Sequence, residues 1–361
     1  MKIIKIKNKT MLLFFILIVI LMFNINFNYK KTFADNNSSE IVIELNSNRI
    51  LHEKNAYKKM YMASTTKILT AITIIENCDL NDVVTVTKDT VGIEGSSIYL
   101  VEGEKLSVKQ LLYGLMLRSG NDCAETLAKH CSGNNEKFAL LMNKTAEKIG
   151  ATNSNFVNPH GLHDDNHYTT ARDLALISSY AMKNNEFREI VQTKVIDIPS
   201  PNKDYNRRLV NKNKMLKEFE GSTGIKTGYT KKAGRCLVSS CIRNGMELIC
   251  VVLNSPNMFE RSKNLLTVSF NKYHNYNIAN HNNVFDFIPV ENSNVMCALV
   301  IKNDITFPLT EHEYEKLEIV CDYPKILKKP VKKDQEVGLI KFYCEKNLLF
   351  EEKIYTILEI K

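Results

Sequence analysis

The sequence predicts an α+β fold in which an antiparallel sheet is flanked by helices, with a mainly helical subdomain and a small C-terminal all-β domain. Three observations predict it. Apolar residues recur at helical spacing through most of residues 64–183, and hairpin-like segments stand on both sides of that region. After residue 284, short apolar runs alternate with turn residues. Because strands flank the helical region on both sides, we expect one sheet built from both, with helices packed on it.

The first 34 residues have the pattern of an export signal. Four lysines among the first nine residues precede an apolar run over 11–23, and Thr-Phe-Ala at 32–34 places small side chains at the cleavage-determining positions. The apolar run is short for a membrane span. We therefore predict a signal peptide over 1–34 and an extracytoplasmic protein, secreted or associated with the cell envelope. An uncleaved N-terminal anchor is the alternative.

The charge balance changes once this leader is set aside. The whole chain has a formal net charge of +8, but residues 1–34 hold six lysines and no acidic residue, so the rest has 42 basic against 40 acidic residues. It lacks the concentrated basic footprint that nucleic-acid binding needs. A basic cluster flanks Pro330 and is interpreted as a solvated loop rather than a membrane or polymer patch. It consists of Lys328, Lys329, Lys332 and Lys333.

The cysteines do not indicate a disulfide framework or a zinc cluster. Nine cysteines are scattered along the chain without a Cys-x-x-Cys motif, and the odd count leaves at least one unpaired. Cys236, Cys241 and Cys250 stand among apolar and β-branched neighbours, where a free cysteine behaves as a small core hydrophobe. We interpret most of them as buried thiols.

A hairpin and a series of helices are predicted before residue 184. The hairpin pairs residues 41–46 with 49–53 across a Ser47-Asn48 turn. A short strand pair, 83–87 with 97–101, is predicted after the first helix. The helices predicted from apolar spacing span 64–77, 108–117, 122–131, 136–149 and 169–183.

Beyond residue 230 the sequence becomes rich in strands. Residues 234–242 and 246–254 are joined by Asn-Gly, a pair that favours the positive φ angles of a tight hairpin. A helix is predicted over 258–274, and the Asn-rich stretch 275–283 is the expected linker. Short strands separated by turns then predict the small all-β domain over 284–361.

Three short motifs carry the chemistry, and none is informative alone. Ser-x-x-Lys occurs three times, at 64–67, 200–203 and 269–272, and Ser-Gly-Asn occurs at 119–121 and 132–134. Seen alone, Ser64 is best interpreted as a helix N-cap, and the second Ser-Gly-Asn as a helix C-terminus whose glycine takes the left-handed cap. Lys-Thr-Gly occurs once, at 226–228.

The order of the motifs and their settings make them informative. Ser64-x-x-Lys67 begins an apolar helix, Ser119-Gly120-Asn121 lies between two helices, and Lys-Thr-Gly at 226–228 leads into the strongest hairpin. Ser-x-x-Lys, Ser-Asp-Asn and Lys-Thr-Gly in that order are the signature of penicillin-binding proteins and class A β-lactamases. Here the middle motif has glycine in place of aspartate.

The flanking residues extend the match. In chain order they are MASTTKILTA, GSSIYLVEGE, LLYGLMLRSGND, FVNPHGL, HYTTARDLALI, GIKTGYT and ELICVVLNSP. With them, the sequence resembles the low-molecular-mass penicillin-binding proteins that are serine-type D-alanyl-D-alanine carboxypeptidases, of the Gram-positive type. Cys123 stands where alanine is usual after SGND, and Tyr61 where proline often precedes the MAS stretch; neither replaces a reactive group.

That resemblance has consequences for the fold and the domains. It implies a β-lactamase/penicillin-binding transpeptidase-like fold, with a serine DD-peptidase catalytic domain over 35–275 and a C-terminal β domain over 284–361. Members of the family often end in an amphipathic membrane-anchoring helix. The strand-like sequence before Lys361 does not predict one here.

Ser64 is the predicted nucleophile and Lys67 its base. At a helix start the N–H of Ser64 has no partner within the helix, so it can face a developing oxyanion. Lys67 lies one turn on, where its amine can reach the Ser64 hydroxyl. A lysine at its reference pKa would be a cation at neutral pH. Burial and a second cation, Lys226, would both favour the neutral form.

The resemblance assigns roles to the other motif residues. It implies that Ser119 shuttles the proton to the leaving group and that Asn121 holds Lys67 and the substrate amide. These residues lie between the helices predicted over 108–117 and 122–131. We therefore expect Ser64, Lys67 and Ser119 to be catalytic.

The Lys-Thr-Gly strand is expected to bind the substrate. By resemblance, Lys226 supplies positive charge for the terminal carboxylate of the substrate, Thr227 adds a hydroxyl, and Gly228 lets the substrate approach the strand. The Tyr229 N–H would be the second oxyanion donor, and removing one such donor typically costs about 2.7–4 kcal/mol in the barrier. Lys212 is the one candidate upstream for a separate carboxylate clamp.

Two other hydrolase classes are less well supported. A Ser-His-Asp hydrolase would need a nucleophile motif of the Gly-x-Ser-x-Gly kind, which does not occur, so His160 is interpreted as fixing a loop. A metal-dependent peptidase is the stronger rival, because one segment holds His160, His163, His167, Asp164 and Asp165. These residues lack the His-Glu-x-x-His arrangement.

The predicted reaction removes the terminal D-Ala from peptidoglycan stem pentapeptides through a Ser64 acyl-enzyme, in cell wall biogenesis. β-Lactams would be covalent inhibitors, and neither a metal nor an organic cofactor is implied. A serine β-lactamase is the remaining enzymatic alternative, and a non-enzymatic wall-binding receptor is a third. The Ser-Gly-Asn motif and the predicted β domain favour the carboxypeptidase.

Overall fold

The computed structural model describes residues 37–200, 206–281 and 283–361. The predicted signal peptide lies outside the described residues, and so do residues 201–203 of the second Ser-x-x-Lys copy. In the part of the chain that is described, no helix is long and apolar enough to cross a membrane.

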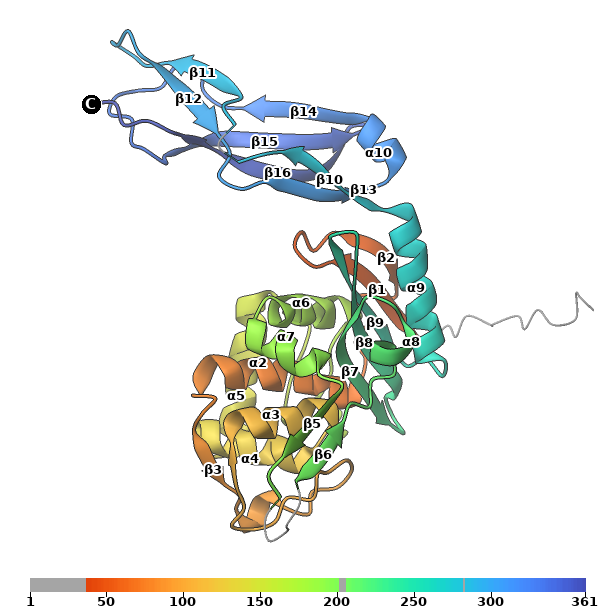
Figure 1. Cartoon of the computed structure of the whole chain (residues 1–361). Helices are drawn as coiled ribbons and strands as arrows, with labels where there is room; N and C mark the ends of the chain where they lie inside the picture. The colour runs from red at the N-terminus through yellow and green to blue at the C-terminus, as the bar shows by residue number, and fades with distance from the viewer. Residues whose placement is uncertain (1–36, 201–205, 282) are drawn as a thin grey trace, which may run out of the picture. The chain divides into compact units, whose positions relative to one another are not determined.

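A five-stranded antiparallel sheet organises the first domain, in the order β2-β1-β9-β8-β7 (Figure 1). Strands from before and after the helical region lie side by side in it, because β1 pairs with β9 along its whole length. This confirms the predicted sheet built from both ends. The strands are β1 (Ser39–Glu44), β2 (Ile50–Lys54), β7 (Ser222–Thr230), β8 (Gly234–Arg243) and β9 (Met246–Leu253).

Both faces of this sheet are buried, and the two-residue period of the strands divides its side chains between two cores. In β9, Ile249 and Val251 pack into the core shared with the helices. Their neighbours Cys250 and Val252 pack into a second core on the opposite face. Near-continuous apolar sequence in β9 follows from this double burial.

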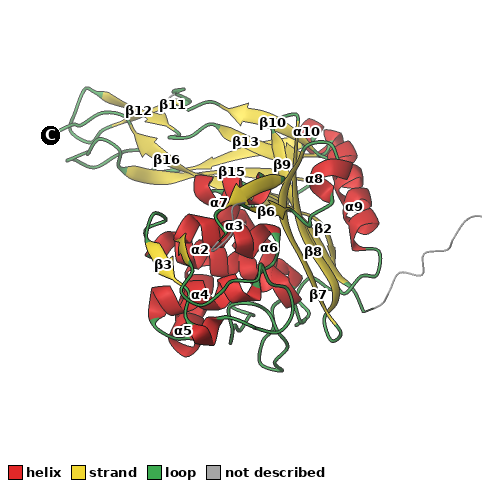
Figure 2. Ribbon diagram, turned by 60° about the horizontal axis from the view of Figure 1, so that its bottom comes forward, coloured by secondary structure: helices red, strands yellow, loops and turns green. Residues whose placement is uncertain are grey.

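Most helices gather on one face of the sheet and α9 covers the other, as Figure 2 shows. The helical face carries α2 (Lys67–Asn77), α3 (Val108–Leu117), α4 (Asn121–Ser132), α5 (Asn135–Ile149), α6 (Ala171–Met182) and α7 (Asn185–Gln192). The opposite face carries α9 (Met258–Lys272), with the short α8 (Met215–Glu218) beside β7. The second Ser-Gly-Asn does end a helix, since Gly133 caps α4 with φ 84°.

One predicted strand pair is wrong. β3 (Val83–Thr85) pairs with β4 (Lys105–Ser107) and not with residues 97–101, which form no strand. The main-chain N–H groups of Ile98 and Leu100 instead donate to the buried carboxylate of Asp122. This carboxylate accepts the hydrogen bonds that the carbonyl groups of a partner strand would otherwise accept. The sequence prediction also missed β5 (Val195–Ile198), its partner β6 (Arg207–Val210), and helices α7 and α8.

The C-terminal domain has its own sheets and its own core. A five-stranded sheet, in the order β11-β12-β16-β15-β14, accompanies a two-stranded sheet of β10 and β13. Ile340, Phe342 and Ile354 belong to a core separate from the two of the first domain. Its elements are β10 (His274–Ala279), β11 (Asp286–Pro289), β12 (Met296–Val300), β13 (Ile305–Leu309), α10 (Glu311–Glu315), β14 (Leu317–Asp322), β15 (Glu336–Cys344) and β16 (Asn347–Thr356).

The expected linker over 275–283 is therefore largely a strand. Residues 274–279 form β10, which pairs in antiparallel fashion with β13. Ile278 and Ala279 also pack against the core of the C-terminal domain. Asparagine is rare in strands, so the composition concealed an element that its partner strand stabilises.

Candidate active site

Ser64 lies in a single 3₁₀ turn, η1 (Ala63–Thr66), directly before α2. The N-cap interpretation of Ser64 is wrong. Met62 and Thr66 occupy the cap positions of η1 and α2, and no side chain caps either helix. The Ser64 hydroxyl is thus left for a contact with Lys67. Ala63 has φ 49°, a left-handed conformation that is uncommon outside glycine and is often found at functional sites.

Lys67 is fully buried and surrounded by three oxygens. Its Nζ lies 3.3 Å from Ser64 Oγ, 2.7 Å from Asn121 Oδ1 and 2.6 Å from the His160 carbonyl oxygen. Burial and the neighbouring Lys226 hold its pKa well below the usual value. A neutral amine has two hydrogens, which the Asn121 and His160 oxygens can accept, and its lone pair then faces the Ser64 hydroxyl.

The Ser-Gly-Asn turn joins α3 to α4, and its Asn121 side chain contacts Lys67. Ser119 is buried and has φ 65°, so the chain turns sharply at this residue. Asn121 is held from two sides: its N–H donates to Ser96 O at 2.7 Å, and its Nδ2 donates to Glu94 O at 2.5 Å. These bonds fix the amide so that its oxygen faces Lys67 Nζ.

The Lys-Thr-Gly residues lie on β7, which is an edge strand of the sheet. Lys226 is buried, and its Nζ donates to Thr227 O at 3.0 Å. Burial, with a smaller contribution from Lys212, lowers the pKa of Lys226 to about 7. A Cβ added at Gly228 would lie 3.1 Å from Ser64 N, so glycine permits the close approach of β7 to Ser64. The exposed Tyr229 follows on the same edge.

Lys212 lies close enough to Lys226 to affect its charge. Lys212 Nζ donates to Ser96 Oγ at 3.1 Å, which ties it to the loop that also holds Asn121. Burial and the neighbouring Arg118 lower the pKa of Lys212. Two lysines with lowered pKa values therefore approach the edge of β7, a surface suited to a carboxylate.

The three histidines of the predicted metal segment have separate partners. His160 Nε2 lies 3.0 Å from the Glu125 carboxylate, and His163 Nε2 lies 3.4 Å from that of Asp165. His167 accepts the Val157 N–H at Nδ1, so Nε2 carries the hydrogen that faces Thr66 Oγ1 at 2.8 Å. Burial and His160 lower the pKa of His167 to about 3, which keeps it neutral.

These contacts do not assemble a metal site. Among the residues that the structure describes, no group of three or more His, Cys, Asp or Glu side chains is arranged to hold a metal ion. His160 instead acts through its backbone, because its carbonyl oxygen contacts Lys67 Nζ. Residue type could not have predicted this contact, and the pairing of His160 with Glu125 was also missed. The loop-fixing interpretation of His160 agrees with both.

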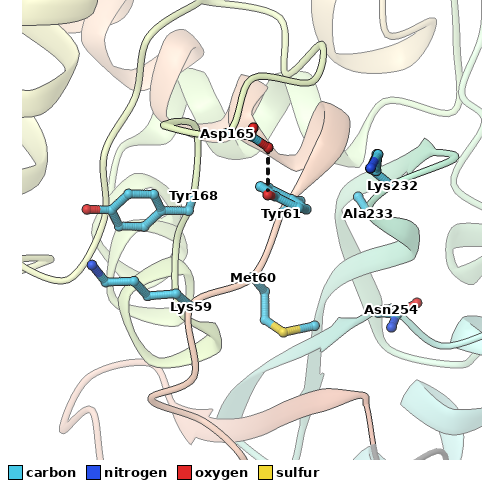
Figure 3. A pocket seen from close by; sticks show the side chains of 8 residues that line it. All are labelled: Lys59, Met60, Tyr61, Asp165, Tyr168, Lys232, Ala233 and Asn254. Atoms are coloured by element: carbon cyan, nitrogen blue, oxygen red, sulfur yellow. Dashed lines mark hydrogen bonds between the residues drawn. The ribbon is translucent and has the colours of Figure 1, made fainter.

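A cavity of about 410 Å³ lies beside the turn that carries Ser64. Figure 3 shows Tyr61 in its wall with the hydroxyl directed at Asp165, 3.0 Å away. Lys232 and Ala233, from the turn after β7, line the same cavity. Ser64 and Lys67 do not line it, so this cavity does not mark the predicted catalytic residues.

Two family profiles match the chain in succession. Residues 29–257 match the D-alanyl-D-alanine carboxypeptidase family, Peptidase_S11, and residues 273–361 match the C-terminal domain of penicillin-binding protein 5. Among curated proteins, the D-alanyl-D-alanine carboxypeptidase DacF of Bacillus subtilis is 30% identical over 330 residues, covering 88% of this chain and 84% of that protein. The Streptomyces sp. K15 D-alanyl-D-alanine carboxypeptidase is 36% identical over 224 residues, covering 58% and 77%.

Solved structures show the same similarity. Penicillin-binding protein 5 from Haemophilus influenzae superposes with a TM-score of 0.79 at 25% identity, covering 89% of this chain and 96% of that one. A mutant of the Streptomyces K15 DD-transpeptidase superposes with a TM-score of 0.60 at 32% identity, covering 64% and 95%. The match to penicillin-binding protein 5 extends into the C-terminal domain, whereas the match to the Streptomyces K15 enzyme covers 64% of this chain.

Proposed function

Because this chain belongs to the D-alanyl-D-alanine carboxypeptidase family, we propose that Ser64 is the nucleophile of its acyl-enzyme and Lys67 the base. The chain is a serine peptidase that hydrolyses a D-Ala-D-Ala bond. One observation carries the residue assignment: Lys67 Nζ is buried among Ser64 Oγ, Asn121 Oδ1 and the His160 carbonyl. General-base catalysis of this kind contributes typically about 10²–10⁴-fold to the rate.

The acylation step follows from these contacts. Ser64 Oγ attacks the carbonyl carbon of the penultimate D-Ala while its proton passes to Lys67 Nζ. The N–H groups of Ser64 and Tyr229 receive the oxyanion. Ser119 then passes a proton to the departing D-Ala amine, and water later hydrolyses the ester. The close approach of Gly228 to the Ser64 N–H supports this arrangement of the two donors.

Substrate binding is assigned to the edge of β7. Lys226, Thr227 and Gly228 would bind the terminal carboxylate of the peptide, with Asn121 near the substrate amide and Lys212 adding positive charge. An edge strand offers unpaired main-chain groups to an extended peptide. A peptidoglycan stem ending in D-Ala-D-Ala fits this chemistry, and β-lactams would acylate the same serine. The export pattern of residues 1–34 supports action outside the cytoplasm, at the cell wall.

Mass spectrometry after brief penicillin treatment tests the nucleophile, and D-Ala release from a diacyl-D-Ala-D-Ala peptide tests the reaction. We expect one penicilloyl adduct on a peptide containing Ser64, and D-Ala release that Ser64→Ala abolishes. Ser269→Ala is a matched control, because Ser269 also stands three residues before a lysine but lies in α9. It should keep both activities.

Two outcomes would redirect the proposal. Absence of both the Ser64 adduct and D-Ala release would contradict it. Rapid turnover of penicillin without peptide cleavage would instead favour the serine β-lactamase, since both enzymes acylate the same residue and differ in how fast water removes the acyl group.

A further inference from the structure

Cys78 and Cys131 meet at the far ends of the two helices that carry active-site residues. Cys78 is the C-cap of α2, and Cys131 lies in the last turn of α4. Lys67 and Asn121, the first residues of the same two helices, are hydrogen-bonded, so α2 and α4 run in the same direction and bring the two cysteines at their ends together. Each thiol also shifts the pKa of the other. Both side chains are partly exposed and both pack against the same apolar core. The pair is therefore close, anchored and reachable from solvent.

A second contact holds the same two segments together. His130 Nε2 lies 3.5 Å from the Asp82 carboxylate, which joins the residue before Cys131 to the turn that follows Cys78. Helices α2 and α4 also pack directly on each other. At their opposite ends, Lys67 of α2 contacts Asn121 of α4. Contacts at both ends therefore hold together the two helices that carry Cys78 and Cys131.

The other seven cysteines offer no comparable pair. Six of them are buried, where oxidants have little access. Cys321 is exposed but alone on β14, opposite Ile340 of β15. Since the described residues contain no metal-binding group of three ligands, the chemistry open to Cys78 and Cys131 is that of two thiols.

We propose that Cys78 and Cys131 form a reversible disulfide that joins the C-terminal ends of α2 and α4. The oxidant is a low-molecular-weight disulfide. The Cys131 thiolate attacks one sulfur of the reagent and expels a thiolate, which leaves a mixed disulfide on Cys131. Cys78 then loses its proton and attacks the Cys131 sulfur, expelling the second thiolate. The two cysteines lose two protons and two electrons, and the reagent becomes two thiols.

The pKa values of the two thiols indicate which one attacks the reagent first. The hydrogen bond from Cys78 lowers the pKa of Cys131 to about 7 and raises that of Cys78. Cys131 is thus the more acidic thiol of the pair and the one that attacks, and Cys78 resolves the mixed disulfide. Although Cys321 is exposed, partial desolvation of its thiol and the nearby Asp286 raise its pKa. We therefore expect Cys321 to react more slowly than Cys131.

The cross-link would stabilise the catalytic domain without touching its reactive groups. It closes a loop from residue 78 to residue 131 that contains α3 and the Ser-Gly-Asn turn. Closing a long loop stabilises mainly by restricting the unfolded chain. We expect oxidation to raise the melting temperature of the catalytic domain by about 5 °C or more, with penicillin acylation of Ser64 retained.

The test treats the folded full chain with oxidised glutathione at pH 7.5, blocks free thiols with N-ethylmaleimide, and maps peptides by mass spectrometry. We expect one cross-linked species joining the peptides of Cys78 and Cys131, reversed by dithiothreitol, together with the rise in melting temperature. Cys78→Ser should lose the cross-link and stop at a glutathione adduct on Cys131. Cys321→Ser is the matched control and should cross-link like the parent chain.

Three results would overturn the disulfide. The first is Cys131 recovered as its maleimide adduct in the parent chain after full exposure to glutathione disulfide. The second is a cross-link that appears only in denaturant. The third is the same rise in melting temperature in Cys78→Ser, which would show that the effect does not come from the bond between these two sulfurs.

Discussion

At the residue scale, the proposed mechanism needs Lys67 and Lys226 in opposite protonation states, although both side chains are buried. In the proposed mechanism Lys67 must be neutral to accept the Ser64 proton, and burial with the charge of Lys226 favours that form. In the same mechanism Lys226 must be a cation to attract the substrate carboxylate, yet burial lowers its pKa to about 7. We therefore expect activity in a pH window whose acidic limit is set by the pKa of Lys67 and whose basic limit is set by the pKa of Lys226.

The pH dependence of kcat/KM should reveal the deprotonation of both lysines. Its acidic limb rises as Lys67 loses its proton, because only the neutral amine is a base. Its basic limb falls near pH 7 as Lys226 loses its charge. A D-Ala-D-alaninamide peptide lacks the terminal carboxylate, so its profile should lose the basic limb and keep the acidic one. Identical basic limbs for the two peptides would exclude Lys226 as the carboxylate partner.

Glu125 is expected to act as a positioning residue. Its carboxylate pairs with buried His160, whose carbonyl contacts Lys67. We expect Glu125→Gln to slow penicillin acylation by roughly tenfold or more, since small misplacements of catalytic groups are costly. Stopped-flow acylation measures this. The control is Glu260→Gln, which removes a surface ion pair to Lys263 and should leave acylation unchanged. Equal rates for both variants would count against the positioning role.

Sequence reasoning at this scale found side chains and missed main-chain groups. Ser64, Lys67 and Asn121 were singled out from motif order, and the structure brings their polar atoms together. The His160 carbonyl was not, because every residue has a carbonyl and only the fold decides which one faces Lys67. The Glu94 and Ser96 carbonyls that hold Asn121 escaped prediction for the same reason.

At the element scale, long periodic segments were predictable and short or irregular ones were not. Helices α3, α4 and α5 agree with their predicted ranges within about two residues. The first turn of the predicted 64–77 helix is instead the 3₁₀ turn η1. Residues 97–101 are held by Asp122, a tertiary contact that no local pattern reports.

The loop at Gly161 lies in close contact with the 3₁₀ turn η1. Gly161 has φ 86°, and a Cβ there would lie 2.0 Å from Ala63 O, in the turn that carries Ser64. Gly150 has a similar φ of 89° with open space around its Cβ position. Any residue with a Cβ pays on the order of 1–2 kcal/mol for the left-handed conformation at either site. Only position 161 adds a steric clash.

We therefore expect Gly161→Ala to cost clearly more unfolding free energy than Gly150→Ala, by about 2 kcal/mol or more. It should also slow the proposed acylation of Ser64, because the clash would displace the turn that carries Ser64. Denaturant unfolding and penicillin acylation measure the two effects. If both variants lost the same stability and kept the same rate, the loop would be free to move away from Ala63.

At the scale of the whole molecule, the chain separates its apolar side chains into distinct cores. Two cores lie on either face of the first sheet, and a third contains only residues of the C-terminal domain. The small all-β domain was predictable from its alternating runs and turns. Its first strand was not, because β10 is rich in asparagine and depends on β13.

Separate cores predict separate effects on stability and chemistry. Phe342 is fully buried in the third core, where its ring stacks on Phe350 with centroids 4.2 Å apart. Phe342→Ala should destabilise the C-terminal domain by about 3–5 kcal/mol. Since none of the residues that contact Lys67 belongs to that core, Ser64 acylation should stay unchanged below the melting transition.

Phe138→Ala is the matched substitution, because Phe138 is equally buried in the core shared by the helices. It should lower the melting transition of the catalytic domain and reduce the acylated fraction at temperatures where the Phe342 variant is still fully reactive. Scanning calorimetry with a fluorescent penicillin resolves the two transitions and assigns each. A single transition shifted equally by both substitutions would mean that the domains unfold as one cooperative unit, with the third core contributing to the stability of the active site.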